Sequence, residues 1–294
     1  MYLLRRLASR STLFDIPKGE IDRPPLKIRG MLIVTCTLVS FFHGSNDGQK
    51  GVGLFMLILI AFLPSRYAVN HDIPDMTILK ELNMTEHILN RAITSDRNNS
   101  QDYQKLINEI EAGKSGLAEK NPLEKNQTYG FRRRVEGIVS SLKQIHKNPK
   151  YNPGTSALKL LEISSKNLSK IVDFAPLWVI MVISLSLGLG TMIGWKRIVV
   201  TIGEKIGNEH LNYAHGATSE VVAASTIGLS TAFGLPVSTT HVLSSGIAGA
   251  MIASGGKGNL NKSTLKNIGM AWVLTLPVSI ALAFGLFMLL HLFV

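Results

Sequence analysis

The sequence contains one cysteine, Cys36, and it lacks the short motifs of nucleotide-driven and metal-dependent hydrolytic enzymes. A single thiol inside an apolar run excludes a disulfide, or a metal site built from several thiolates, within one chain. There is no Walker loop and no HExxH helix. Ser238 lies near His241 in the sequence, but no strand-turn-helix elbow and no third orienting residue accompanies them. We therefore predict that the chain is not an enzyme and carries no cofactor.

Charge is scarce over long stretches of the chain. Of the 294 residues, 46% are hydrophobic and 17% are charged. The apolar residues gather in four nearly uncharged runs, at 31–63, 174–195, 217–254 and 268–294. Each run can cross a hydrocarbon core about 30 Å thick. A soluble fold would have to bury four such helices completely, so we predict an integral membrane protein.

Acidic residues are fewer than basic ones, at 20 against 31, and the formal net charge is +11. The basic residues concentrate before the first two apolar runs, within residues 5–29 and 132–170. These positions are typical of the cytoplasmic ends of spans and of segments beside anionic lipid. The charge therefore indicates a lipid bilayer as a partner and argues against nucleic acid.

Composition divides the chain into four segments. Residues 1–30 form a basic, proline-bearing lead-in, and residues 31–65 form a first membrane unit. Residues 66–172 form a polar extramembrane insert, and residues 173–294 form a C-terminal transmembrane bundle. A helix as long as the first membrane unit would exceed the bilayer thickness, so one crossing and two crossings both remain open.

The insert contains two segments with helical periodicity. Leu and Ile recur at three- and four-residue spacing in residues 78–93 and 158–172. Gly, Pro and Asn indicate looser chain near 113–130 and 147–155. We expect a partly helical subdomain that serves as a solvated connector between membrane segments.

Two polar stretches interrupt the apolar runs, and each predicts a broken helix. In GSNDG, residues 44–48, Gly44 and Gly48 destabilise the helix, while Asn46 and Asp47 favour caps and turns. In GLPVSTTH, residues 234–241, the proline cannot continue a helix, and Ser238 or Thr239 can cap the next one. A helix that begins inside a membrane directs free N–H groups and a positive dipole end into the space it faces, which suits an anion.

The charged residues beside these breaks are the candidates for ion coupling. Asp47 is an intramembrane carboxylate, expected to bind a cation or carry a proton, although it could instead cap a helix at the interface. Glu220 could reach the same cavity or lie at a helix N-terminus near the interface. Lys50 could pair with Asp47, contact an anion or extend to the membrane surface.

The histidines and hydroxyl side chains at the breaks complete the candidate set. His43 and His241 could shuttle protons or bind a metal, or they could be hydrogen-bonded structural residues. Ser238, Thr239 and Thr240 offer hydroxyl groups at the start of the second helix. Discontinuous helices around a central site are a common construction of secondary transporters.

The stretches HGSNDGQKGVGLFMLILIAF and GLPVSTTHVLSSGIAGAMIASG resemble signatures of the inorganic phosphate transporter (PiT) family, in particular of bacterial low-affinity permeases. The resemblance covers some 40 residues, and Glu220 also falls where the family carries a glutamate. It implies phosphate transport, with Ser45, Asn46, Ser238, Thr239 and Thr240 at the phosphate and Asp47, Glu220 and Lys50 in coupling.

Lys50 departs from the pattern of sodium-coupled relatives, which read GANDVANA and place asparagine at this position. A fixed positive charge there disfavours bound sodium. The resemblance therefore implies that phosphate enters with a proton or as a neutral complex with a divalent metal.

The family is built from two inverted halves, and each half carries both motifs. This chain has one copy of each and resembles a C-terminal half. We expect it to act as a homo-oligomer or with a separate N-terminal half, or to be a truncated chain that does not transport.

The prediction is thus an all-α polytopic protein of the inner membrane, with broken helices and one half of an inverted repeat. Phosphate symport is the expected function. Transport of another oxyanion such as sulfate, and a scaffold role through residues 66–172, are the alternatives.

Overall fold

The computed structural model describes residues 6, 12–17, 24–118 and 125–291. Within them the secondary structure is helical, with a single isolated bridge between Gly207 and Leu260, so the all-α prediction is confirmed. The helices are η1 (Thr12–Phe14), α2 (Leu26–Phe62), α3 (Pro64–Tyr67), α4 (Asp75–Ser95), η2 (Arg97–Asn99), α5 (Ser100–Ala118), α6 (Lys125–Lys147), α7 (Thr155–Val172), α8 (Leu177–Glu204), α9 (Tyr213–Ala232), α10 (Thr239–Gly255), η3 (Lys257–Asn259) and α11 (Lys262–His291).

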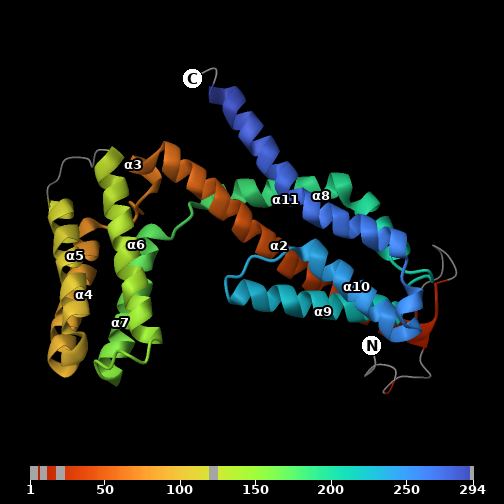
Figure 1. Ribbon diagram of the computed structural model, residues 1–294, viewed down its shortest axis with the longest axis horizontal. Coiled ribbons are helices and arrows are strands. Elements are labelled where there is room, and N and C mark those ends of the chain that lie inside the picture. The colour runs from red at the N-terminus through yellow and green to blue at the C-terminus, as the bar shows by residue number, and fades with distance from the viewer. Residues whose placement is uncertain (1–5, 7–11, 18–23, 119–124, 292–294) are drawn as a thin grey trace. The chain divides into compact units, whose positions relative to one another are not determined.

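The chain divides into two compact units. The first unit combines residues 1–50 with residues 183–294 and holds α9, α10, α11 and most of α8 (Figure 1). The second unit, residues 51–182, holds the four helices of the insert. Each unit has its own buried residues, and the candidate site lies in the first.

α2 is one continuous helix of 37 residues, so the break expected at residues 44–48 is wrong. It begins directly after Pro24 and Pro25, and at about 1.5 Å per residue it is about 55 Å long. The polar side chains do not open the helix because they pair along it, at the spacings i,i+3 and i,i+4. Gly44 and Gly48 have helical backbone with open space around them.

The second predicted break is confirmed. α9 ends at Ala232, and the chain turns at Gly234, whose φ of 67° lies in the left-handed region that favours glycine. α10 then begins at Thr239, after Pro236. Ser238 is its N-cap, and its hydroxyl accepts a hydrogen bond from the His241 amide at 3.4 Å.

Two helices in the described residues are long and apolar enough to cross a membrane: α2, and α11 over Lys262–Leu289. The pair of α7 and α8, taken together across the break between them, is a third candidate. The expected run 217–254 is divided between α9 and α10, and neither alone meets the same criterion. α9 carries polar residues along its length, and α10 has only 17 residues.

The insert is more regular than the sequence suggests. α4, α5, α6 and α7 pack in a ring in which each helix contacts two neighbours, around a core that includes Leu82, Tyr103, Leu142 and Leu161. Residues 113–118 and 125–130 are helical rather than loose, whereas the connector expected near 147–155 is present. Residues 119–124, and most of the lead-in 1–30, lie outside the described residues.

Candidate functional site

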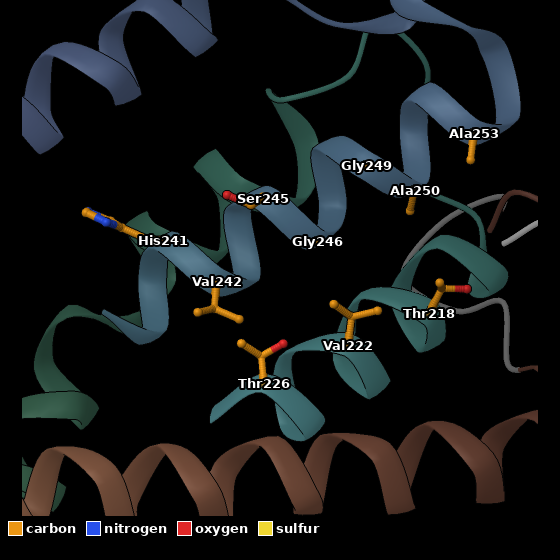
Figure 2. A pocket seen from close by; sticks show the side chains of 10 residues that line it. All are labelled: Thr218, Val222, Thr226, His241, Val242, Ser245, Gly246, Gly249, Ala250 and Ala253. Carbon is orange, nitrogen blue, oxygen red and sulfur yellow. The ribbon is translucent and has the colours of Figure 1, made fainter. Parts of the chain in front are cut away.

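α2, α9 and α10 position the candidate site, and α9 and α10 pack along each other. Between α9 and α10 lies a groove of about 560 Å³ lined by small and hydroxyl-bearing residues (Figure 2). Figure 2 shows Val242 of α10 and Thr226 of α9 pointing toward each other across this groove, while His241 points away from α9. Gly246 of α10 lies against α9, where an added methyl group would be in van der Waals contact with the Ser219 backbone at 3.4 Å.

Asp47 is held by two basic side chains of its own helix. Its Oδ1 lies 2.9 Å from Lys50 Nζ, and its Oδ2 lies 3.0 Å from His43 Nε2. About a quarter of the Asp47 side chain remains exposed, at 27%. The carboxylate is therefore paired but still open to a ligand, and the reading of Asp47 as a mere helix cap does not fit its place inside α2.

The same two basic side chains reach the break between α9 and α10. Lys50 Nζ donates to the carbonyl oxygen of Val237 at 2.5 Å, and His43 Nε2 lies 3.4 Å from Thr239 Oγ1. The structure therefore brings His43, Asp47 and Lys50 of α2 together with Thr239 of α10, which lies far from them in the sequence. We call these four residues the Asp47 cluster.

Asn46 faces α9 and is buried, with 3% of its surface exposed. Its Nδ2 donates to Thr231 Oγ1 at 3.1 Å, and its Oδ1 is buried without a hydrogen-bond partner among the described residues. Sequence reasoning missed Thr231, whose only signal is a hydroxyl in the last turn before the break. Ser45, the neighbouring residue, is half-buried on α2.

Glu220 does not join the Asp47 cluster. Its carboxylate accepts a hydrogen bond from Thr35 of α2, a residue that sequence reasoning also missed. Eleven residues, or about 16 Å of helix, separate Glu220 from Thr231 along α9. Since α9 begins at Tyr213, Glu220 lies two turns inside it, so of its two predicted placements the one at a helix N-terminus is wrong.

The hydroxyls of the second motif diverge. Thr239 is buried and faces α2, whereas Ser238 and Thr240 line a cavity of about 520 Å³ with side chains of α8 and α11. His241 lies on that same side, and its ring stacks on Trp272 with the ring centroids 4.1 Å apart. A single phosphate site formed by all three hydroxyls is therefore not present within the described part of this chain.

The described residues contain no group of three or more His, Cys, Asp or Glu that could hold a metal ion. His43 and Asp47 form a pair only. The chemistry that the Asp47 cluster can supply is a fixed cation, an adjacent carboxylate and a histidine at hydrogen-bond distance, together with hydroxyl and amide groups. Such a set suits an anion that travels with a proton or a cation.

The fold and this cluster define an all-helical membrane protein with an ionisable group inside a span-length helix and a helix break beside it. Residues 13–283 match the phosphate transporter family. The chain belongs to that family. The prediction that it is not an enzyme agrees with this membership.

Named relatives support the assignment. The chain is 37% identical over 318 aligned positions to a low-affinity inorganic phosphate transporter of Buchnera aphidicola from Acyrthosiphon pisum, covering 96% of this chain and 62% of the relative. It is 36% identical to the low-affinity inorganic phosphate transporter PitB of Escherichia coli K12, covering 98% of this chain and 64% of the relative. For PitA of the same organism the identity is 37%, over 92% of this chain and 59% of the relative. The chain thus spans about three fifths of the length of these relatives. No solved structure matches it.

Proposed function

We propose that the chain takes part in moving inorganic phosphate across the membrane as a secondary transporter. The observation that carries this proposal is the Asp47 cluster, in which a lysine, a carboxylate and a histidine of α2 meet the break between α9 and α10. The relatives named above as phosphate transporters support the same substrate. We place the protein in the inner membrane as a multi-pass protein.

Each residue of the cluster has a chemical role in this proposal. Lys50 offsets the charge of the phosphate, and Thr239 donates a hydroxyl hydrogen bond to it. Asp47 and His43 take up and release a proton, since they are already in contact at 3.0 Å. A protonated histidine would also strengthen the attraction for the anion.

Asn46 supports phosphate over sulfate as the substrate. Its buried Oδ1 is an acceptor without a donor, and such a group carries a desolvation penalty. Inorganic phosphate retains a proton near neutral pH and can donate an O–H to this oxygen, whereas sulfate has no proton to offer. Ser45, one residue earlier, supplies a further hydroxyl on the same helix.

We further propose that coupling uses a proton, or a divalent metal that enters bound to phosphate, rather than sodium. The support is Lys50, whose ammonium lies 2.9 Å from the Asp47 carboxylate. A monovalent cation at this carboxylate would have to displace the ammonium group or tolerate its repulsion.

A complete transport pathway requires more than one Asp47 cluster in this proposal. The chain has one GSND motif and one PVSTTH motif, and the hydroxyls of the second motif point to two different sides. A second copy of the chain, or a separate polypeptide with the matching motifs, would supply the other side of the site.

The test is uptake of labelled phosphate by cells that lack other phosphate transporters. Asp47→Asn should lower the initial rate at least about tenfold, as expected when a charged partner worth about 1.5–3 kcal/mol is removed. Asp72→Asn is the matched control, because Asp72 is exposed in the insert, and it should leave the rate unchanged. Excess sulfate should not compete.

Three results would contradict parts of this proposal. Unchanged uptake in Asp47→Asn, at equal amounts of protein in the membrane, would remove the cluster from transport and favour a scaffold role. Strict dependence on sodium, without response to pH or divalent metal, would overturn the coupling. Rapid uptake by vesicles that each hold one chain would refute the need for a second cluster.

A further inference from the structure

The two layers of the insert differ in charge. Residues 75–118, which form α4 and α5, contain five lysines and arginines against seven acidic residues. Residues 125–172, which form α6 and α7, contain ten lysines and arginines against two glutamates. The proposed transport function makes no use of this difference.

Packing determines where these charges lie. α4 contacts α5 and α7, and α6 contacts α5 and α7, so α6 and α7 form one layer and α4 and α5 form the opposite one (Figure 1). The exposed residues of α6 and α7 therefore point away from α4 and α5. Lys159, Lys166 and Lys170 are all exposed and are spaced by seven and four residues, which aligns them in one stripe along α7.

α6 extends the same charged surface. Arg133, Lys143 and Lys147 are exposed and fall on one side of that helix. We call the six residues of α6 and α7 the basic face. It consists of Arg133, Lys143, Lys147, Lys159, Lys166 and Lys170.

Most of the basic face is not neutralised by the protein itself. The two glutamates of this layer pair with basic side chains at close range: Glu136 with Arg132 at 2.8 Å and Glu162 with Lys166 at 2.6 Å. In the part of the chain that the structure describes, no ion pair reaches Arg133, Lys143, Lys147 or Lys159. The remaining positive charge needs an external partner or solvent.

Apolar side chains lie among these charges. Tyr129 is 47% exposed and precedes Arg133 by one helical turn. Ile163 is 50% exposed and follows Lys159 by one turn. Clustered basic residues attract anionic lipid, and exposed aromatic and aliphatic groups among them can enter the membrane interface.

The chain keeps the insert close to a bilayer. α7 ends at Val172, and the apolar helix α8 begins only a few residues later, at Leu177. At the entry side, twelve residues lie between Phe62, where α2 ends, and Asp75, where α4 begins. Arg132 Nη1 ties both connections to α6 by donating to Ala68 O at 3.0 Å and Val172 O at 2.5 Å.

We propose that the basic face is a docking surface for the anionic headgroups of the membrane in which the chain is embedded. Charge complementarity and the short tethers to apolar helices favour lipid over a soluble partner. Tyr129, Ile163 and Leu160, which is 36% exposed, would enter the interfacial region. Docking holds the insert against the surface instead of leaving it as a free connector.

The test places a fluorescent probe on each layer of the full chain, reconstituted in vesicles with nitroxide-labelled headgroups. Cys36 is first replaced by serine, so that the introduced cysteine is the only one. Ser140→Cys carries the probe on the exposed side of α6, and Asn108→Cys carries it on the exposed side of α5 as the matched control. Anionic lipid in both leaflets makes the result independent of orientation.

We expect the Ser140 probe to be quenched several-fold more in anionic vesicles than in zwitterionic ones, and the Asn108 probe to show no such difference. About 1 M NaCl, which shortens the Debye length to about 3 Å, should remove most of the quenching. Replacing Lys159, Lys166 and Lys170 together by glutamine should also remove most of the quenching of the Ser140 probe. The control, glutamine at Lys80, Arg91 and Lys105 of α4 and α5, should not.

Equal quenching of the two probes, or equal quenching in the two lipids, would overturn the proposal. So would quenching that survives the triple substitution in α7. A basic face that serves an acidic protein or a nucleic acid would leave the Ser140 probe unquenched in vesicles that contain no other macromolecule, and this result too would overturn it. Circular dichroism of each variant checks that the helices remain folded.

Discussion

Lys50 of α2 donates to the carbonyl oxygen of Val237 at 2.5 Å, in the irregular segment that separates α9 from α10. The same ammonium group lies 2.9 Å from Asp47. Lys50 thus joins the carboxylate of the candidate site to the helix break, which lacks regular backbone hydrogen bonds. A change in the charge of Asp47 would therefore alter the hydrogen bond between Lys50 and Val237 at the break.

Lys50→Met should therefore remove both contacts. We expect phosphate uptake to fall about tenfold or more, because a partly buried carbonyl and a carboxylate each lose a charged partner worth about 1.5–3 kcal/mol. Lys50→Arg should retain part of the activity, since it keeps the charge but changes the geometry. The measurement is the initial rate of labelled phosphate uptake, with and without sodium. Lys80→Met, on the exposed side of α4, is the control, and an equal loss there would show that the effect is unspecific.

The Asn46–Thr231 hydrogen bond should stabilise the contact between α2 and α9. Thr231→Val leaves Asn46 Nδ2 without its partner, so we expect a loss of about 1–3 kcal/mol in the free energy of unfolding. Thr37→Val is the control because Thr37 is exposed and bonds only within α2. Thermal unfolding in detergent of the two single variants and of the double variant at Asn46 and Thr231 measures the coupling energy between these two side chains. Additive effects of the two single substitutions would exclude a direct contact.

The break between α9 and α10 could be predicted because its causes are local. Gly234, Pro236 and Ser238 follow each other within five residues, and each has a known effect on backbone conformation. The continuity of α2 could not be predicted in the same way. Its polar residues pair with one another along the helix, but they also depend on Val237, Thr239 and Thr231, which lie far away in the sequence and give no local signal.

Long-range pairing also explains the errors at individual residues. Thr35 and Glu220 are 185 residues apart, and no local pattern indicates that they meet. The divergence of Ser238 and Thr240 from Thr239 depends on which neighbours surround α10, namely α2 on one side and α8 and α11 on the other. The types of the site residues could thus be read from the sequence, but not their partners.

Gly228 of α9 should be required for the contact with Phe42 of α2. A methyl group at this position would lie 3.1 Å from the ring of Phe42. Gly228→Leu should therefore destabilise the first unit by about 1–3 kcal/mol through overpacking. Gly44→Leu is the matched control, because nothing lies within 4 Å of its added Cβ atom, and it should be neutral or slightly stabilising. The measurement is the unfolding temperature in detergent, and equal effects of the two variants would contradict this packing.

Asp96 should make the stability of the insert depend on pH. Its buried carboxylate accepts hydrogen bonds from the Asn152 amide at 2.8 Å, from Tyr103 at 2.9 Å and from Asn99 Nδ2 at 2.9 and 3.0 Å. Burial by itself would raise the pKa of Asp96, but these hydrogen bonds outweigh it and hold the pKa below its ordinary value. The contacts tie the connector between α6 and α7 to the start of α5.

Because this pKa is lowered on folding, the carboxylate stabilises the insert above its unfolded pKa of about 3.9, and the stabilisation is lost as the pH falls through the folded value. Asp96→Asn should cost about 1–3 kcal/mol at neutral pH, since the amide cannot accept all these bonds. The difference from the parent should shrink below about pH 4, where the carboxylate becomes protonated. Hydrogen exchange of the connector amides in the full chain, followed from neutral to acid pH, measures this. Asp72→Asn, at an exposed position, should show no effect. If the loss of stability caused by Asp96→Asn stays constant with pH, it is due to the changed shape of the side chain and not to its charge.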